Sequence, residues 1–296
     1  MEGHCFGHTK PKAPSPLRSA GALQIRACLQ GFFDRLALAL ISTQNTKPLV
    51  EFQEVSFRID GGPPIIDRLN LNVSSGETLV LLGDSGCGKT TTLRLVNRLL
   101  TPTSGEVKVE GKATTNWDPI QLRRRTGYVI QEAGLFPHFT VAENVAIVPS
   151  LENWEQNKIT ARVSELLALV GLEPAKFAGR YPRELSGGQR QRVGVARALA
   201  ADPPLLLMDE PFGALDPLTR ASLQKEFDEL KSRLGKTVIF VTHDVREALM
   251  LGSRIALMDA GKIVLLETPQ AFVKSEDERV RAYLETLSEP PAVAGG

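Results

Sequence analysis

The sequence predicts an α/β fold, because strand-like and helix-like segments alternate from Leu49 onward. Two further observations support this class. A glycine-rich loop, Gly83 to Thr90, stands between an apolar run and a helical segment, and a later apolar run ends on the acids Asp209 and Glu210. This pattern is typical of buried parallel strands that bring ligand-binding residues to their carboxyl ends.

The composition limits the possible classes of protein. The 296 residues suffice for two domains, or for one domain with a large insertion. The 35 Lys and Arg residues nearly balance the 34 Asp and Glu residues, so no basic field favours nucleic acid and we expect no nucleic-acid partner. The three cysteines are scattered, which argues against a disulfide framework or a zinc site and fits a reducing cytoplasm. No run of 18 apolar residues predicts a membrane span.

Residues 1–47 are rich in proline and basic residues, and we expect them to form a disordered N-terminal extension outside the folded core. Two interpretations of Leu23 to Ile41 stay open: a loose amphipathic helix, or sequence added by an upstream start codon. His4, Cys5 and His8 lie close together, but no fourth residue has the spacing of a zinc ligand.

The first elements after this extension are strands. Val50 to Arg58 and Ile65 to Val73 are expected to pair across a turn that contains Gly61 and Gly62. Glu77 to Leu82 is nearly continuously apolar, which indicates a buried strand. A helix from Thr91 to Leu100 is expected after the glycine-rich loop.

The glycine-rich loop has the pattern G-x-x-x-x-G-K-[ST] in the strand–loop–helix context of a phosphate-binding loop. Its glycines let successive backbone N–H groups converge on phosphate oxygens, and the helix N-terminus adds a partial positive charge. Lys89 is placed to reach the β and γ phosphates, and the Thr90 hydroxyl is a hard oxygen ligand suited to Mg²⁺. The Cys87 thiol is expected to be a spectator. The predicted nucleotide-binding residues of this segment are Gly83, Asp84, Ser85, Gly86, Cys87, Gly88, Lys89, Thr90 and Thr91.

Two later strands are expected to end at the same edge of the sheet. Pro204 to Met208 ends on Asp209, which can hold Mg²⁺ through its hydration shell, and on Glu210, which can orient or deprotonate an attacking water. Thr237 to Thr242 delivers His243, which we expect to contact a γ-phosphate and hold the water in register. Glu210 and His243 are therefore the predicted catalytic residues. A solvated strand end or a structural histidine is the simpler interpretation of each alone, but a nearby phosphate-binding loop weakens it.

The pentapeptide from Leu185 to Gln189, Leu-Ser-Gly-Gly-Gln, predicts a second helix start. Ser186 is a natural N-cap, and the two glycines leave N–H groups open before a helix expected from Gln189 to Ala200. The string should occur by chance on the order of once per million positions. It therefore indicates a second anion-binding helix terminus.

Two other helices are indicated between the loop and the pentapeptide. Asp118-Pro119 with Gln121 is a helix-start signature before Leu122. Further on, apolar residues repeat at helical spacing before Gly171 and are expected in the core: Ile159, Val163, Leu166, Leu167 and Val170.

Together these motifs resemble those of the ATP-binding subunits of ABC transporters, over about Leu49 to Leu287. The pentapeptide is similar to the family's signature, and it occurs in family order with the phosphate-binding loop, the acidic strand end and three further motifs. Gln131, after Tyr128-Val129-Ile130, is similar to the Q-loop glutamine; Gly213 to Asp216 is similar to the D-loop, and His243 to the switch histidine.

The resemblance implies a RecA-like P-loop NTPase core with an antiparallel β subdomain and an inserted α-helical subdomain at about 132–197. The ABC ATP-binding domain would span 48–287, followed by a tail at 288–296. The implied ligands are ATP and Mg²⁺, with Thr90, Gln131 and Asp209 around the metal. The signature residues would act in trans on ATP held by a second ATP-binding subunit, so a homodimer is expected: Ser186, Gly187, Gly188 and Gln189.

Finer resemblances point to a cargo. The segments from Leu93 to Leu99, Gly134 to His138 and Tyr181 to Glu184 look most like those of importers of glycine betaine, choline and related osmoprotectant quaternary amines. This implies an ATP hydrolase at the cytoplasmic face of the cell membrane, with permease subunits as partners and a substrate-binding protein as an indirect one. The Gln131 loop would transmit closure to permease helices near Leu135 to Phe139.

Two alternatives stay open. An amino-acid or sulfonate importer is the first. The second, a non-transport ABC ATPase acting on DNA or ribosomes, is disfavoured because the sequence has no long heptad insertion, zinc hook or second cassette.

The sequence departs from the family at one position. Ile59 stands where the resemblance leads us to expect an aromatic residue that stacks on adenine. Strand alternation would put Phe57 and Ile59 on one face, so either could cover the base with apolar surface.

Overall fold

The computed structural model describes residues 48–287 with the exception of 132 and 214. The expectations for residues 1–47 and 288–296, including the group His4, Cys5 and His8, lie outside the described residues.

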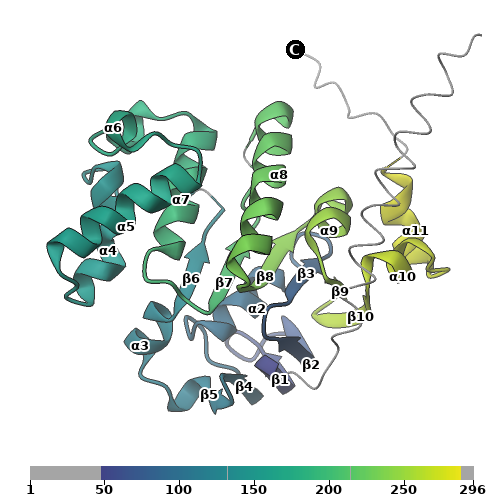
Figure 1. Ribbon diagram of the computed structural model, residues 1–296. Helices are drawn as coiled ribbons and strands as arrows, with labels where there is room; N and C mark the ends of the chain where they lie inside the picture. The colour runs from purple at the N-terminus through teal and green to yellow at the C-terminus, as the bar shows by residue number, and fades with distance from the viewer. Residues whose placement is uncertain (1–47, 132, 214, 288–296) are drawn as a thin grey trace, which may run out of the picture. The chain divides into compact units, whose positions relative to one another are not determined.

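The described chain builds two sheets (Figure 1). The larger has the strand order β10-β9-β3-β8-β7-β6, with five parallel strands and β10 antiparallel at its edge. The smaller is antiparallel, with the order β2-β1-β4-β5. The predicted α/β class with an antiparallel β part is thus confirmed. The strands are β1 Pro48–Phe57, β2 Ile66–Ser74, β3 Thr78–Leu82, β4 Ser104–Val109, β5 Lys112–Ala113, β6 Thr126–Val129, β7 Leu205–Asp209, β8 Thr237–Thr242, β9 Arg254–Asp259 and β10 Lys262–Glu267.

The helices fall into groups around the larger sheet (Figure 1). Helices α4 to α7 lie together beyond β6, as expected of an inserted helical subdomain, and α10 and α11 lie on the side of β10. The helices are α2 Lys89–Val96, η1 Thr114–Asn116, α3 Pro119–Arg124, α4 Val141–Leu151, α5 Gln156–Leu169, α6 Pro174–Phe177, η2 Pro182–Glu184, α7 Gly187–Leu199, α8 Pro217–Leu234, α9 Val245–Leu251, α10 Pro269–Val273 and α11 Glu278–Glu285.

Strand β3 shows how the larger sheet is buried on both faces. All five of its residues are buried, as expected of a strand inside a parallel sheet. Leu79 and Leu81 belong to the apolar cluster shared with the smaller sheet, whereas Val80 and Leu82 belong to the cluster shared with the helices. This alternation of side chains fixes the strand between two layers, and with it the position of the loop that follows.

The helical predictions are confirmed with small shifts. Asp118 caps α3, and the five apolar residues expected in the core of the α5 region are all buried. The helix after the glycine-rich loop ends at Val96 rather than Leu100, because Asn97 closes its end and Arg98 takes a left-handed conformation with a φ of 53°. The helix after the pentapeptide begins at Gly187, two residues before the predicted Gln189.

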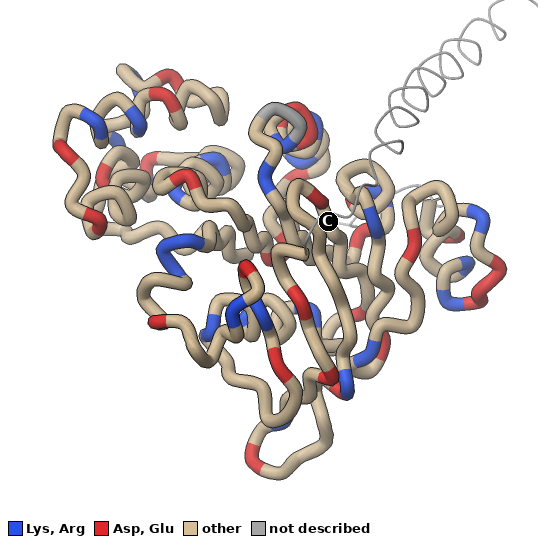
Figure 2. Tube along the Cα trace, turned by 60° about the horizontal axis from the view of Figure 1, so that its bottom comes forward, with Lys and Arg blue, Asp and Glu red and all other residues tan. Residues whose placement is uncertain are grey.

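Charged residues of both signs are interspersed along the described chain (Figure 2). Among the helices of the described residues, none combines the length and the apolar character needed to cross a membrane.

Candidate functional site

Four neighbouring parallel strands, in the order β3, β8, β7 and β6, carry the predicted site residues at their carboxyl ends. The glycine-rich loop follows β3, and His243 follows β8. Asp209 ends β7 with Glu210 next to it, and Gln131 lies two residues beyond β6. Parallel strands end at one edge of a sheet, which is where ligands bind in such folds, so segments far apart in sequence meet there.

The glycines of the loop are required by close approaches. A Cβ on Gly83 would lie 2.3 Å from the Met258 carbonyl oxygen, and a Cβ on Gly88 would lie 2.6 Å from the Ile66 side chain. Gly88 also has a φ of 107°, a left-handed conformation that favours glycine, and it caps the N-terminus of α2. The loop is thus packed closely against β2 and β9.

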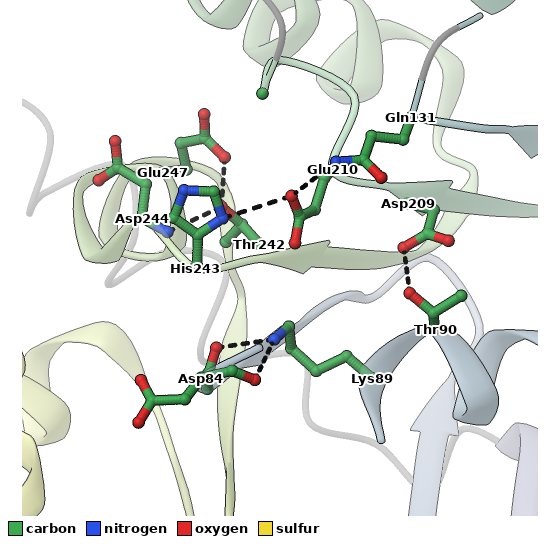
Figure 3. Close-up of polar contacts among 12 residues, drawn as sticks. Asp84, Lys89, Thr90, Gln131, Asp209, Glu210, Thr242, His243, Asp244 and Glu247 are labelled. Atoms are coloured by element: carbon green, nitrogen blue, oxygen red, sulfur yellow. Dashed lines mark hydrogen bonds and ion pairs between the residues drawn. The ribbon is translucent and has the colours of Figure 1, made fainter. Parts of the chain in front are cut away.

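Lys89 lies inside this loop. Its side chain is 5% exposed, and its Nζ donates to the carbonyl oxygens of Gly83 at 2.7 Å and Asp84 at 2.8 Å (Figure 3). The ammonium group is therefore held at the centre of the loop, where it can exchange a carbonyl oxygen for a phosphate oxygen. Cys87 is buried beside it, and its backbone N–H donates to Asp84 in the turn. Asp84, Ser85 and Gly86 form the exposed part of the loop.

The two oxygen ligands proposed for the metal touch each other. The Thr90 Oγ1 donates to Asp209 Oδ1 at 2.8 Å across the sheet edge (Figure 3). The Tyr128 hydroxyl donates to the second oxygen, Oδ2, at 3.3 Å. A hydroxyl and a carboxylate in contact form the hard oxygen donor set that Mg²⁺ prefers, so these residues fit the metal.

Burial changes the pKa values of Asp209 and of Tyr128 beside it. It raises the pKa of Asp209, while the hydrogen bonds from Thr90 and Tyr128 act in the opposite direction. Burial, helped by the charge of Asp209, raises the pKa of Tyr128 to about 12, so the phenol remains a hydrogen-bond donor at neutral pH.

Glu210 contacts two other predicted site residues, Gln131 and His243. Its Oε2 accepts from Gln131 Nε2 at 3.3 Å and lies 3.4 Å from His243 Nδ1 (Figure 3). The backbone of Glu210 has a φ of 44°, and its N–H donates to Val241 of β8 at 3.0 Å. A left-handed backbone conformation at a glutamate costs free energy. Such conformations persist where the surrounding structure fixes them.

The structure does not join every predicted residue. Gln131 contacts Glu210 rather than Thr90 or Asp209, so its role as a metal ligand stays a prediction. The pentapeptide lies in the helical group: Ser186 Oγ accepts from Gln189 N–H at 3.3 Å, and Gln189 Oε1 accepts from Ser186 N–H at 3.0 Å. This reciprocal pair is a capping box at the start of α7, and it confirms Ser186 as the N-cap.

The expectation for Phe57 is wrong. Phe57 is 8% exposed and belongs to the apolar core, whereas Ile59 is 57% exposed. Strand β1 ends at Phe57, so the alternation of the strand does not continue to Ile59. Of these two residues, Ile59 is the one that could cover a base.

Sequence reasoning missed three contacts at this site. Tyr128 belongs to the segment before Gln131, but its hydrogen bond to Asp209 depends on the pairing of β6 with β7. Tyr283 of α11 donates to Asp84 Oδ1 at 2.7 Å, and Glu247 of α9 accepts from Thr242 at 2.6 Å. The first two pairs are distant along the chain, and no signal in the sequence joins them. Thr242 and Glu247 are only five residues apart, and their contact depends on the turn between β8 and α9.

Comparison with known proteins agrees with this geometry. The family model for ABC transporter matches residues 66–213. The chain is 49% identical, over 77% of its length, to the glycine betaine/carnitine/choline transport ATP-binding protein OpuCA of Bacillus subtilis (strain 168), of which it covers 60%. It is 51% identical, over 75% of its length, to the glycine betaine uptake system ATP-binding protein YehX of Escherichia coli (strain K12), of which it covers 71%. The chain thus spans about 60% of the length of the first curated relatives it matches.

Solved structures show the same fold. The chain is 34% identical to the ATP-binding cassette MJ0796, in a dimeric post-hydrolysis state bound to ADP and Pi, with a TM-score of 0.67. The match covers 74% of this chain and 98% of that one. The family model, the relatives and the cassette fold agree with the site described above: this chain belongs to the ABC transporter family, as one of its ATP-binding proteins.

Proposed function

We propose that this chain binds and hydrolyses ATP to drive an ABC importer of glycine betaine, choline or a related quaternary amine. The observation that carries the ATPase part is the convergence of Lys89, the Thr90–Asp209 pair and Glu210 at one sheet edge. The cargo rests on the resemblance to transport proteins named for glycine betaine, carnitine and choline.

Phosphate binding is the task of the glycine-rich loop. Its backbone N–H groups and the N-terminus of α2 would face the phosphate oxygens, while Lys89 neutralises their charge. Thr90 and Asp209 would hold Mg²⁺, which supplies charge neutralisation at the β and γ phosphates when bound.

Glu210 has the geometry of a residue that prepares water. Gln131 and His243 both approach its Oε2, which orients the carboxylate and leaves Oε1 to accept a proton from a water molecule. The His243 side chain is 58% exposed, so it can also reach a γ-phosphate beyond the sheet edge.

The segment Leu135–Phe139 is the proposed contact with the permease. The side chain of Asn144, fully buried, fixes it by donating to the carbonyl oxygens of Phe136 and Phe139, both at 3.1 Å. Phe136 is nevertheless 45% exposed and packs against the ring of Phe139. A fixed loop that presents an apolar ring suits a peripheral subunit docked on a membrane partner at the cytoplasmic face.

Glu210→Gln tests the ATPase assignment in the purified full chain. We expect ATP turnover to fall by about a hundredfold or more, because general-base catalysis is lost. Binding of ATP should be kept, since the phosphate loop is untouched. Unchanged turnover would contradict the role of Glu210.

Uptake tests the cargo. The chain is expressed together with the permease subunits and binding protein of a quaternary-amine importer in cells that lack betaine uptake. Accumulation of labelled glycine betaine and choline is then measured with and without Glu210→Gln. We expect uptake that the substitution abolishes. Uptake of an amino acid or a sulfonate instead would contradict the proposed cargo and leave the ATPase assignment intact.

A further inference from the structure

Glu247 is a buried carboxyl group that the mechanism above does not use. It lies in the first turn of α9 and is 4% exposed. Burial raises its pKa, as expected for a carboxyl group moved away from water. A buried carboxyl group destabilises a fold unless donors surround it, so its partners indicate why it is there.

Two donors from different elements meet this carboxyl group. Thr242 Oγ1, at the end of β8, donates to Glu247 Oε2 at 2.6 Å, and Gln224 Nε2 of α8 donates to Oε1 at 2.8 Å. Each oxygen thus accepts one hydrogen bond. The carboxylate connects the end of a central strand to the long helix that follows the D-loop segment.

Thr242 links Glu247 to the turn that carries His243. Its hydroxyl donates its one proton to Glu247 and accepts from the backbone N–H of Asp244 at 3.0 Å (Figure 3). Thr242 is 2% exposed, so its side chain has little freedom. The residues on both sides of His243 are therefore held through one hydroxyl group.

His243 needs such support from its backbone. Its side chain is 58% exposed, and it lies 3.4 Å from Glu210 Oε2, so packing does little to fix the ring. The position of the imidazole then depends on the turn from Thr242 to Asp244.

We propose that Glu247 is a positioning residue for His243, acting through the Thr242 hydroxyl. The proposal rests on the proposed function, because His243 matters only if it takes part in ATP turnover. The competing explanation is that Glu247 only stabilises the packing of α9 against α8.

A double-mutant cycle separates these explanations. ATP turnover is measured for the purified full chain and for Glu247→Gln, His243→Ala and the double variant. We expect Glu247→Gln to lower kcat by about tenfold with little change in KM for ATP, since misplacing a catalytic contact costs this order of rate. In the His243→Ala background, Glu247→Gln should have no further effect, because the group it positions is gone.

Each other outcome has a distinct meaning. An equal fall in kcat in both backgrounds, or no fall in either, would overturn the positioning role. Unchanged turnover in His243→Ala would also overturn the proposal, because His243 would then have no part in ATP turnover. Absence of ATP turnover in the unsubstituted chain would contradict the proposed function instead. Glu229→Gln, at an exposed position of α8, is the matched carboxyl-to-amide control and should behave as the unsubstituted chain.

A second pair keeps the test valid if Glu247→Gln does not fold. Thr242→Ser keeps the hydroxyl group and should keep turnover, whereas Thr242→Val keeps the shape of the side chain and should lower kcat about tenfold. Equal turnover in the two variants would contradict the relay through Thr242.

Discussion

At the scale of single residues, the site depends on contacts between side chains that are distant in sequence. Thr90 and Asp209 are joined at 2.8 Å, and Glu210 is approached by Gln131 and His243 on one oxygen. The residue types were predictable, because each belongs to a motif with a known chemical task. The pairings were not, because they arise from the order β3, β8, β7 and β6 in the sheet.

Thr90 gives the first prediction at this scale. Thr90→Val removes a hard oxygen while keeping the branched shape, so we expect the Mg²⁺ concentration needed for ATP binding to rise by about tenfold or more. Thr90→Ser keeps the hydroxyl group and should stay close to the unsubstituted chain. Titration of ATP binding with Mg²⁺ measures this; equal curves for Val and Ser would exclude Thr90 as a ligand.

Ile59 gives the second prediction. Its side chain is 57% exposed and aliphatic, so it can cover a base without the electrostatic part of ring stacking. Ile59→Tyr should tighten ATP binding by roughly two- to tenfold, which corresponds to an aromatic contact of about 0.5–1.5 kcal/mol. Calorimetric titration with ATP measures the change. Unchanged ATP affinity would show that the adenine base does not lie against residue 59. Phe57→Tyr is not an alternative test, because Phe57 is buried.

At the scale of elements, strands were predicted better than helix ends. The strand Thr237–Thr242 has the predicted bounds, because a continuous run of β-branched and aromatic residues indicates a buried strand. The end of α2 was missed because the buried Asn97 side chain accepts from Leu99 N–H, a local contact that competes with the helix. Phe57 was misplaced because β1 ends there, two residues before the position of interest.

Helix α9 gives a prediction about pH and stability. The pKa of Glu247 is raised above its ordinary value of 4.5, so the folded state binds this proton more tightly than the unfolded state. The stability that the neutral carboxyl group contributes is complete below 4.5 and is lost as the pH rises through the folded pKa. The Glu247→Gln variant has no titratable group at this position, so it does not lose this stability as the pH rises.

Thermal unfolding of the two proteins from pH 4.5 upward tests this. We expect the melting temperature of Glu247→Gln, minus that of the unsubstituted chain, to increase with pH. A difference that stays constant or decreases would show that the pKa is not raised. Glu229→Gln, at an exposed position, is the control.

At the scale of the whole molecule, the described chain holds one phosphate-binding loop and one signature, on different parts of the fold. The loop follows β3 of the central sheet, whereas the signature begins α7 in the helical group (Figure 1). Ser186 and Gln189 cap α7, and Gly187 lines a hollow together with Gln131, Arg190 and Leu215. This arrangement supports the proposal that the signature completes the ATP site of a second copy, as the dimeric relative suggests.

Two substitutions are designed to disable the two halves of this composite site separately: one the phosphate-binding loop, the other the signature. Lys89→Ala removes the ammonium group at the centre of the loop. Gly187→Glu places a negative charge where a phosphate would approach. The fold should tolerate it, because a Cβ there would meet its nearest neighbour at 3.8 Å and an acid is favourable at a helix N-terminus. Gly188 is unsuitable, since its Cβ would lie 2.5 Å from Thr219.

Mixing the two inactive variants tests the central claim most directly. In a mixed dimer, one site contains both defects and the other contains none, so ATP turnover should return to about a quarter of the unsubstituted level when half the dimers are mixed. Each variant alone should stay inactive. A mixture as inactive as its components would contradict the account, because the signature would then serve the ATP bound by its own chain.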